Sequence, residues 1–184
     1  MKPIEINELW SMKLTPSDLY NIERGEGEGP VGGGGQGFIQ IAKKNVLNLL
    51  KFVGKNYSDL PINLEVHNFF TLSGGVERIN LSSKSGGRMR FNNQNRHRTP
   101  RLTAWSNTHG FPVLGKNDDI DIAKETLNQI GGVRLFLARS VNGEVYAGFT
   151  QGEADEQESE QPFAEQLWGS AAKGGYWSLK GGIV

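Results

Sequence analysis

The chain has 184 residues, no cysteine and a formal net charge of +0. This length fits one domain whose hydrophobic core needs neither a metal nor a disulfide. The lack of cysteine excludes disulfide frameworks, thiolate zinc sites and cysteine nucleophiles. No apolar run in residues 1–14 is long enough for a signal peptide or a membrane span, so we expect a cytoplasmic protein without membrane contact.

Hydrophobic periodicity predicts many short strands and two helices. Strands are expected over residues 36–41, 61–69, 76–81, 88–92 and 101–105, and helices over 42–53 and 120–130. The first helix ends before Gly54, and the second ends before Gly131 and Gly132. This pattern favours a mainly β (α+β) fold of the partly open barrel type.

A hairpin is the clearest local signal. Residues 133–141 and 144–150 are strand-like, and Asn142 and Gly143 lie between them. Asn-Gly tolerates the positive φ angles of a type I′ turn, whose twist matches that of antiparallel strands. We therefore predict a two-residue type I′ hairpin here.

Three further segments have a biased composition. Residues 24–36 are rich in glycine and predict a flexible arm, and residues 152–161 are acidic and predict a solvated loop. Residues 169–184 contain two Gly-Gly pairs and predict a tail or linker, so the domain is expected to span residues 1–168.

The neutral net charge conceals a segregation of charge along the chain. Residues 78–117 carry eight basic and no acidic side chains, whereas residues 118–184 carry five basic and eleven acidic ones. Such asymmetry suggests a polyanionic partner. The alternative is a solvated face that acidic neighbours balance in the fold.

A basic, amide-rich stretch over residues 88–105 is the strongest candidate site. Arginine pairs with the O6 and N7 of guanine, asparagine and glutamine pair with the N6 and N7 of adenine, and all of them reach phosphates. We therefore predict that duplex DNA is the partner. The expected contacts are Arg90, Asn92, Asn93, Asn95, Arg96, His97, Arg98, Thr99, Arg101, Thr103 and Trp105, with Arg24 and Gln36 reaching from the glycine-rich arm.

The sequence gives little support for a catalytic site or a metal site. The glycine-rich segment lacks the Lys-Ser or Lys-Thr of a phosphate loop, and Glu26 and Glu28 would repel phosphate. His67, His97 and His109 are scattered, so no metal site and no cofactor are expected. No Asp or Glu begins the acid-x-lysine triplet common in magnesium-dependent nucleases, so this segment should not cut DNA by itself.

The order of these features is similar to a known family. A glycine-rich arm ending Gly33-Gly34-Gly35-Gln36 leads into a strand and an aliphatic helix, and the basic loop closes on Arg101-Leu102-Thr103-Ala104-Trp105. This resembles the N-terminal effector domain of EcoRII-type restriction endonucleases, a B3-like fold. The resemblance covers roughly residues 19–168.

The resemblance implies an open seven-stranded β pseudo-barrel with short flanking helices. Two arms, residues 24–40 and 91–105, would grip the major groove at a short site of the CC(A/T)GG type. A nuclease domain, fused or associated, would cut the DNA. Thr99 and Pro100 stand where the EcoRII domain has Glu-Lys, and Gly35 replaces a side chain that could contact a base. The bases recognised at these positions are therefore not carried over.

Three other classes of function are alternatives. An enzyme with its site on the glycine-rich loop, such as a nucleotide hydrolase, would be stabilised against heat by nucleotide, and we expect no such effect. An RNA-binding module would expose aromatic stacking platforms, and the basic loop offers Phe91 and Trp105. A non-catalytic regulatory domain would instead use the acidic residues 153–160 as its contact.

Overall fold

The computed structural model describes residues 2–24, 39–69, 76–83, 87–91, 118–129, 131–151 and 177–183. Side chains are described throughout these ranges except at residues 21–24, 77, 90, 91, 151 and 180–183.

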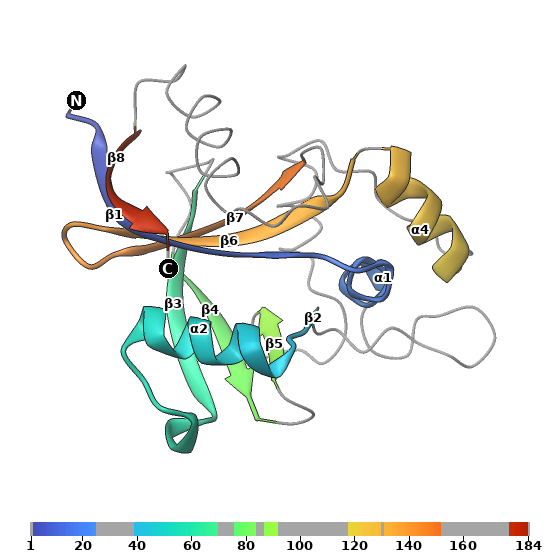
Figure 1. Ribbon diagram of the computed structural model, residues 1–184, viewed down its shortest axis with the longest axis horizontal. Helices are drawn as coiled ribbons and strands as arrows, with labels where there is room; N and C mark the ends of the chain where they lie inside the picture. Colours follow the sequence, from blue (N-terminus) through green and yellow to red (C-terminus); the bar gives the residue numbers. More distant parts are fainter. Residues whose placement is uncertain are drawn as a thin grey trace.

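The described strands form one open, mixed sheet, so the predicted mainly β class is confirmed. The strands are β1 (Ile4–Lys13), β2 (Ile39–Gln40), β3 (Ile62–Asn68), β4 (Glu77–Ser82), β5 (Arg88–Phe91), β6 (Val133–Ser140), β7 (Val145–Gln151) and β8 (Trp177–Ile183). Their order across the sheet is β2-β5-β4-β3-β7-β6-β1-β8. The pairs β1–β8 and β3–β7 are parallel and the others are antiparallel. Figure 1 shows β1, β6 and β7 running across the molecule, with β3, β4 and β5 steeply inclined to them.

In the described part of the chain, three α-helices accompany the sheet: α1 (Pro16–Arg24), α2 (Lys43–Val53) and α4 (Ile120–Gln129). The helices predicted over 42–53 and 120–130 are confirmed as α2 and α4. Gly54 ends α2 in the left-handed conformation with φ 68°, which glycine adopts without steric cost. A short 3₁₀ helix, η2 (Tyr57–Asp59), leads from α2 into β3.

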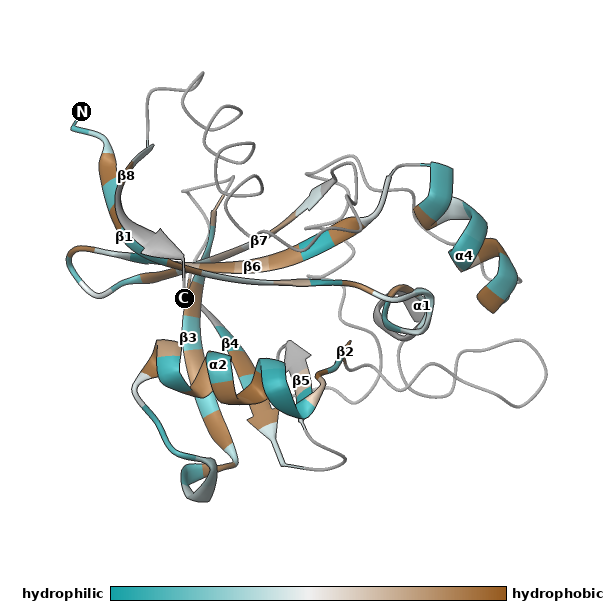
Figure 2. Ribbon diagram, viewed as in Figure 1, coloured by the Kyte–Doolittle hydropathy of each residue, from teal (hydrophilic) through white to brown (hydrophobic). Residues whose placement is uncertain are grey.

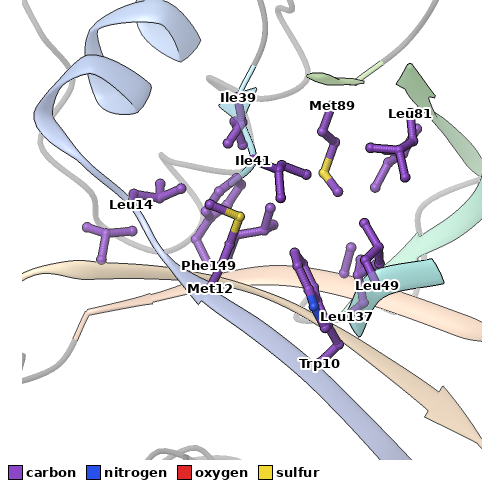
Figure 3. Packing of buried hydrophobic residues seen from close by; sticks show 14 of the residues in the cluster. Trp10, Met12, Leu14, Ile39, Ile41, Leu49, Leu81, Met89, Leu137 and Phe149 are labelled. Carbon is purple, nitrogen blue, oxygen red and sulfur yellow. The ribbon is translucent and has the colours of Figure 1, made fainter. Parts of the chain in front are cut away.

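The main core lies between the two halves of the sheet and α2. Trp10, Met12, Leu137 and Phe149 come from β1, β6 and β7, and they pack in one cluster with residues of α2 and β2 to β5. Figure 3 shows Ile39, Ile41 and Met89 on one side of this core and Trp10, Met12 and Phe149 on the other. Figure 2 shows hydrophobic and hydrophilic residues mixed along β3 and around α2, as expected for elements with one buried face.

A second cluster lies on the opposite face of β1, β6 and β7. Its buried members are Ile6, Leu9, Phe69, Phe136, Ala138, Tyr146 and Trp177. The Trp177 ring stacks on Phe69 at 4.1 Å between centroids and meets the Tyr146 ring edge-on at 4.9 Å. Trp177 therefore anchors β8 to this face.

Two strands were not predicted. β1 pairs with β6 and β8, and its register shifts between Ile6 and Glu8. β8 lies within residues 169–184, where a tail or linker was expected, yet it is hydrogen-bonded to β1 as part of the sheet. At residues 177–183 the expectation of a linker is therefore wrong, because Trp177 and the pairing with β1 hold this segment.

The remaining strand predictions have mixed outcomes. β3, β4 and β5 match the expected strands to within one or two residues, whereas the strand expected over 36–41 is seen only as β2. The strand expected over 101–105 and the acidic loop over 152–161 lie outside the described residues.

The hairpin of β6 and β7 is confirmed, but its turn is not the predicted type. The backbone N–H of Gly143 donates to the carbonyl of Ser140 at 2.9 Å, so Val141 and Asn142 are the central residues. The Ser140 N–H donates to the Glu144 carbonyl at 2.8 Å. The loop is thus one residue longer than a two-residue type I′ turn. Gly143 takes the left-handed position, with φ 87°, as in three-residue hairpin loops.

Candidate nucleic-acid interface

The two predicted arms are rooted on neighbouring strands of the sheet. The glycine-rich arm returns to the sheet at β2, and the basic arm leaves the sheet at the end of β5. These strands pair antiparallel, with Ile39 opposite Met89 and Gln40 opposite Arg88. The first residue of β2 therefore lies at the same end of the pair as the last residue of β5. The roots of the two predicted arms are therefore neighbours in the sheet, although they are far apart in the sequence.

The other end of the glycine-rich arm is the end of α1. Thr15 precedes this helix and Pro16 begins it, as is common at the first helical position. The Thr15 N–H and Oγ1 donate to Asp18 Oδ2 at 2.9 and 2.8 Å, and the Asp18 N–H donates to Thr15 Oγ1 at 3.2 Å. This reciprocal pattern is a capping box, which sets where α1 starts. The helix then ends at Arg24, where the arm begins.

Asp18 also ties α1 to β2. Its Oδ1 accepts a hydrogen bond from the backbone N–H of Gln40 at 3.1 Å. Only 1 % of the Asp18 surface is exposed. Burying a carboxylate is costly unless hydrogen bonds replace its water, and here donors from Thr15 and Gln40 occupy both oxygens. The bond to Gln40 therefore joins the first turn of α1, the helix that precedes the glycine-rich arm, to the strand that follows the arm.

Gly87 completes the contact between β2 and β5, the roots of the two arms. Its carbonyl oxygen, just before β5, accepts from Gln40 Nε2 at 3.1 Å and from the backbone N–H of Ile41 at 2.9 Å. A Cβ at position 87 would overlap the buried side chain of Val46 in α2, so a glycine is needed here for β5 to approach the helix. We call Asp18, Gln40 and Gly87 the arm base.

Positive charge surrounds the arm base on the β5 side. Lys43 and Lys44 are exposed at the start of α2, and the described segments 39–53 and 87–91 contain no Asp or Glu. In contrast, α4, which packs against α1, exposes Asp121 and Glu125 beside one lysine, Lys124, and the exposed Asp119 immediately precedes the helix. The described residues around β2 and β5 are therefore basic, and those around α4 are mainly acidic.

Most of the predicted contact residues lie outside the described part of the chain. These are Gln36, Asn92, Asn93, Asn95, Arg96, His97, Arg98, Thr99, Arg101, Thr103 and Trp105. Arg24 is the last residue of α1, and Arg90 lies in β5 opposite Asn80 of β4. The structure thus places the roots of both predicted arms together, and the contacts themselves remain predictions.

The arm base was not predicted from the sequence, although a signal for part of it is present. Thr15-Pro16-Ser17-Asp18 carries an N-cap residue, a proline at the first helical position and an acid three residues after the cap. That pattern predicts the start of α1. No local pattern, however, predicts that Asp18 and Gly87 both bond to Gln40.

Metal centres and membrane spans are other kinds of site that a chain can carry. In the described part of the chain, no group of three or more His, Cys, Asp or Glu residues could hold a metal ion. None of the described helices is both long and apolar enough to cross a membrane. No family model, curated protein or solved structure matches this chain.

Proposed function

We propose that this chain binds duplex DNA sequence-specifically through two arms that rise from one base. It would serve as the recognition or effector domain of a type II restriction endonuclease, with a short site of the CC(A/T)GG type. The observation that carries the proposal is the adjacency of the arm roots: the ends of β2 and β5 deliver the glycine-rich and the basic segments to one place.

The chemistry of the two segments supports this assignment. The basic arm follows β5 in a stretch of the sequence without a single carboxylate, so nothing within it repels phosphate. Phosphate contacts supply affinity, and arginine and amide side chains supply base recognition in the major groove. A glycine-rich partner arm lets backbone approach the duplex closely.

The architecture is compatible with the family that the sequence resembles. The eight-stranded sheet folds around the main core, with β1, β6 and β7 on one side and β3 to β5 on the other. We propose that it is a variant of the open B3-like pseudo-barrel, with α1 and α2 among its short flanking helices. The nuclease domain would lie elsewhere, and the complex would act in the cytoplasm.

Selection from a random duplex library tests the proposal. We expect an enriched short motif, because base-edge contacts discriminate between sequences. Arg98→Ala and Arg101→Ala should each lower affinity for that motif by about 1–3 kcal/mol if they contact guanine, or lower the salt slope by about 1 if they contact phosphate only. Lys55→Ala is the matched control, since Lys55 is exposed beyond the far end of α2.

Three outcomes would contradict the proposal. The first is a library without enrichment together with no duplex retained at low salt. The second is unchanged affinity in both arginine variants. The third is a preference for single-stranded RNA over duplex DNA at moderate salt, which would favour an RNA-binding module.

A further inference from the structure

We propose that the arm base is a positioning device: Asp18, Gln40 and Gly87 hold β2 and β5, the roots of the two arms, in a single relative placement. This inference rests on the proposed function. It adds that sequence discrimination depends on three residues that need not touch the DNA.

Within the described residues, the backbone pairing of β2 with β5 comprises Ile39 with Met89 and Gln40 with Arg88. The side chains of Asp18 and Gln40 add hydrogen bonds to it in two directions, toward α1 and toward β5.

Asp18 joins the helix that precedes the glycine-rich arm to the strand that follows it. Its bond to the Gln40 N–H joins residues 22 positions apart, and so closes the loop that carries the arm. A chain rich in glycine has many conformations, and closing its base reduces the set that the arm can adopt. The buried Asp18 carboxylate stabilises this closed loop, because the Gln40 N–H would lose this hydrogen-bond acceptor without it.

Gln40 transmits this placement to the basic arm. Its backbone is held by Asp18, and its side chain donates to the Gly87 carbonyl at 3.1 Å. β5 starts at the next residue and runs to Phe91, where the basic arm begins. A shift of Gln40 therefore moves the roots of both arms.

Loosening the base should affect specific and non-specific binding differently. Hydrogen bonds to base edges weaken steeply when distance and angle depart from their optimum. Attraction between arginine and phosphate declines slowly with distance, so it should change little when the arms are displaced. We therefore expect loss of specificity with little loss of non-specific affinity.

The first test compares binding to the selected duplex and to a scrambled duplex of equal length. The variants are Gln40→Met, which keeps the length of the side chain and removes its donor, and Asp18→Asn, which keeps the shape and removes one acceptor. We expect about tenfold or greater loss on the selected duplex and less than about twofold on the scrambled one, in the range of one lost base contact. Asn56→Ala, which removes a capping side chain beside η2, should change neither.

The second test needs no DNA. Because the chain has no cysteine, Val31→Cys with Asn93→Cys places one spin label in each arm. We expect the distance distribution between the labels to be broader in Gln40→Met and Asp18→Asn than in the wild-type base, in samples whose circular dichroism shows an intact fold.

The two tests separate failure of this inference from failure of the proposed function. Equal loss on both duplexes, or unchanged binding to both, overturns the positioning role. So does a label distribution that is the same with and without the substitutions. If the wild-type chain retains no duplex, the proposed function fails, and the label distances still decide whether the base holds the arms.

Discussion

Substituting Gly87 with alanine tests the close packing of β5 on α2. The added Cβ would overlap Cγ2 of Val46 and lie 3.6 Å from its Cβ and Cγ1. Val46 has no exposed surface, so it has no room to retreat into solvent. Overpacking of this kind costs about 1–3 kcal/mol.

Moving β5 away would relieve the overlap but would disturb the arm base. The Gly87 carbonyl accepts from Gln40 Nε2 and from the Ile41 N–H, and each weakened bond costs about 1 kcal/mol. Depending on how overlap and bond loss are shared, we expect Gly87→Ala to lower the free energy of unfolding by about 2–4 kcal/mol.

A double-mutant cycle with Val46→Ala identifies the cause. Val46→Ala alone should cost about 2 kcal/mol, because it deletes buried methyl groups. In its presence the added Cβ of Gly87→Ala meets only the Cβ of residue 46, at the ordinary contact distance of 3.6 Å. The two effects should therefore fall short of their sum by about 1–3 kcal/mol. Urea unfolding followed by tryptophan fluorescence and circular dichroism measures all four free energies. A Gly87→Ala variant within about 0.5 kcal/mol of wild type, or strictly additive effects, would refute this packing.

Three further predictions concern the second cluster and the hairpin. Burial, and then the bond to Glu144, raises the pKa of the Tyr146 phenol from 10.0 to about 12. The contribution of this raised pKa to the free energy of unfolding is complete below pH 10 and is lost as the pH rises through 12. Tyr146→Phe should therefore remove the part of the loss of stability at alkaline pH that this phenol causes. Phenolate absorbance of Tyr146 that rises near pH 10 would contradict this prediction. Trp177→Ala should lower the free energy of unfolding by about 3–5 kcal/mol and should speed amide hydrogen exchange in β8. Unchanged exchange would show that the stacking of Trp177 on Phe69 does not anchor the strand. Gly143→Ala should cost about 1 kcal/mol in thermal unfolding through its φ of 87° alone, and no change would mean that the turn has another conformation.

Local patterns predicted the elements whose signals are complete within a few residues. α2 repeats apolar residues at helical spacing and ends at a left-handed glycine, and β3 alternates over its length. The β6–β7 hairpin is marked by Asn142 and Gly143, although only the hydrogen bonds reveal that the turn centres on Val141 and Asn142. Such elements depend on short-range physical preferences and are predictable from one sequence.

β1 escaped prediction because a bulge breaks its alternation. Ile6 and Leu9 are an odd number of positions apart, yet both belong to the second cluster. The register shift between Ile6 and Glu8 makes this possible, because one extra residue reverses the faces of all later residues in the strand. Trp10 then faces the main core. Periodicity alone does not reveal where such an insertion falls.

For the candidate site too, one part was predictable from the sequence and the other part was not. The sequence by itself determined the chemical character of the arms, since the absence of carboxylates over residues 78–117 and the glycines before Gln36 are properties of the chain. Only the tertiary structure decided that the roots of the arms lie together and that Asp18, Gln40 and Gly87 join them. It also placed β8 in the sheet, where glycine pairs had suggested a linker. The physical reason is that pairing between distant strands is selected by the packing of the whole core, in which no local segment encodes its partner.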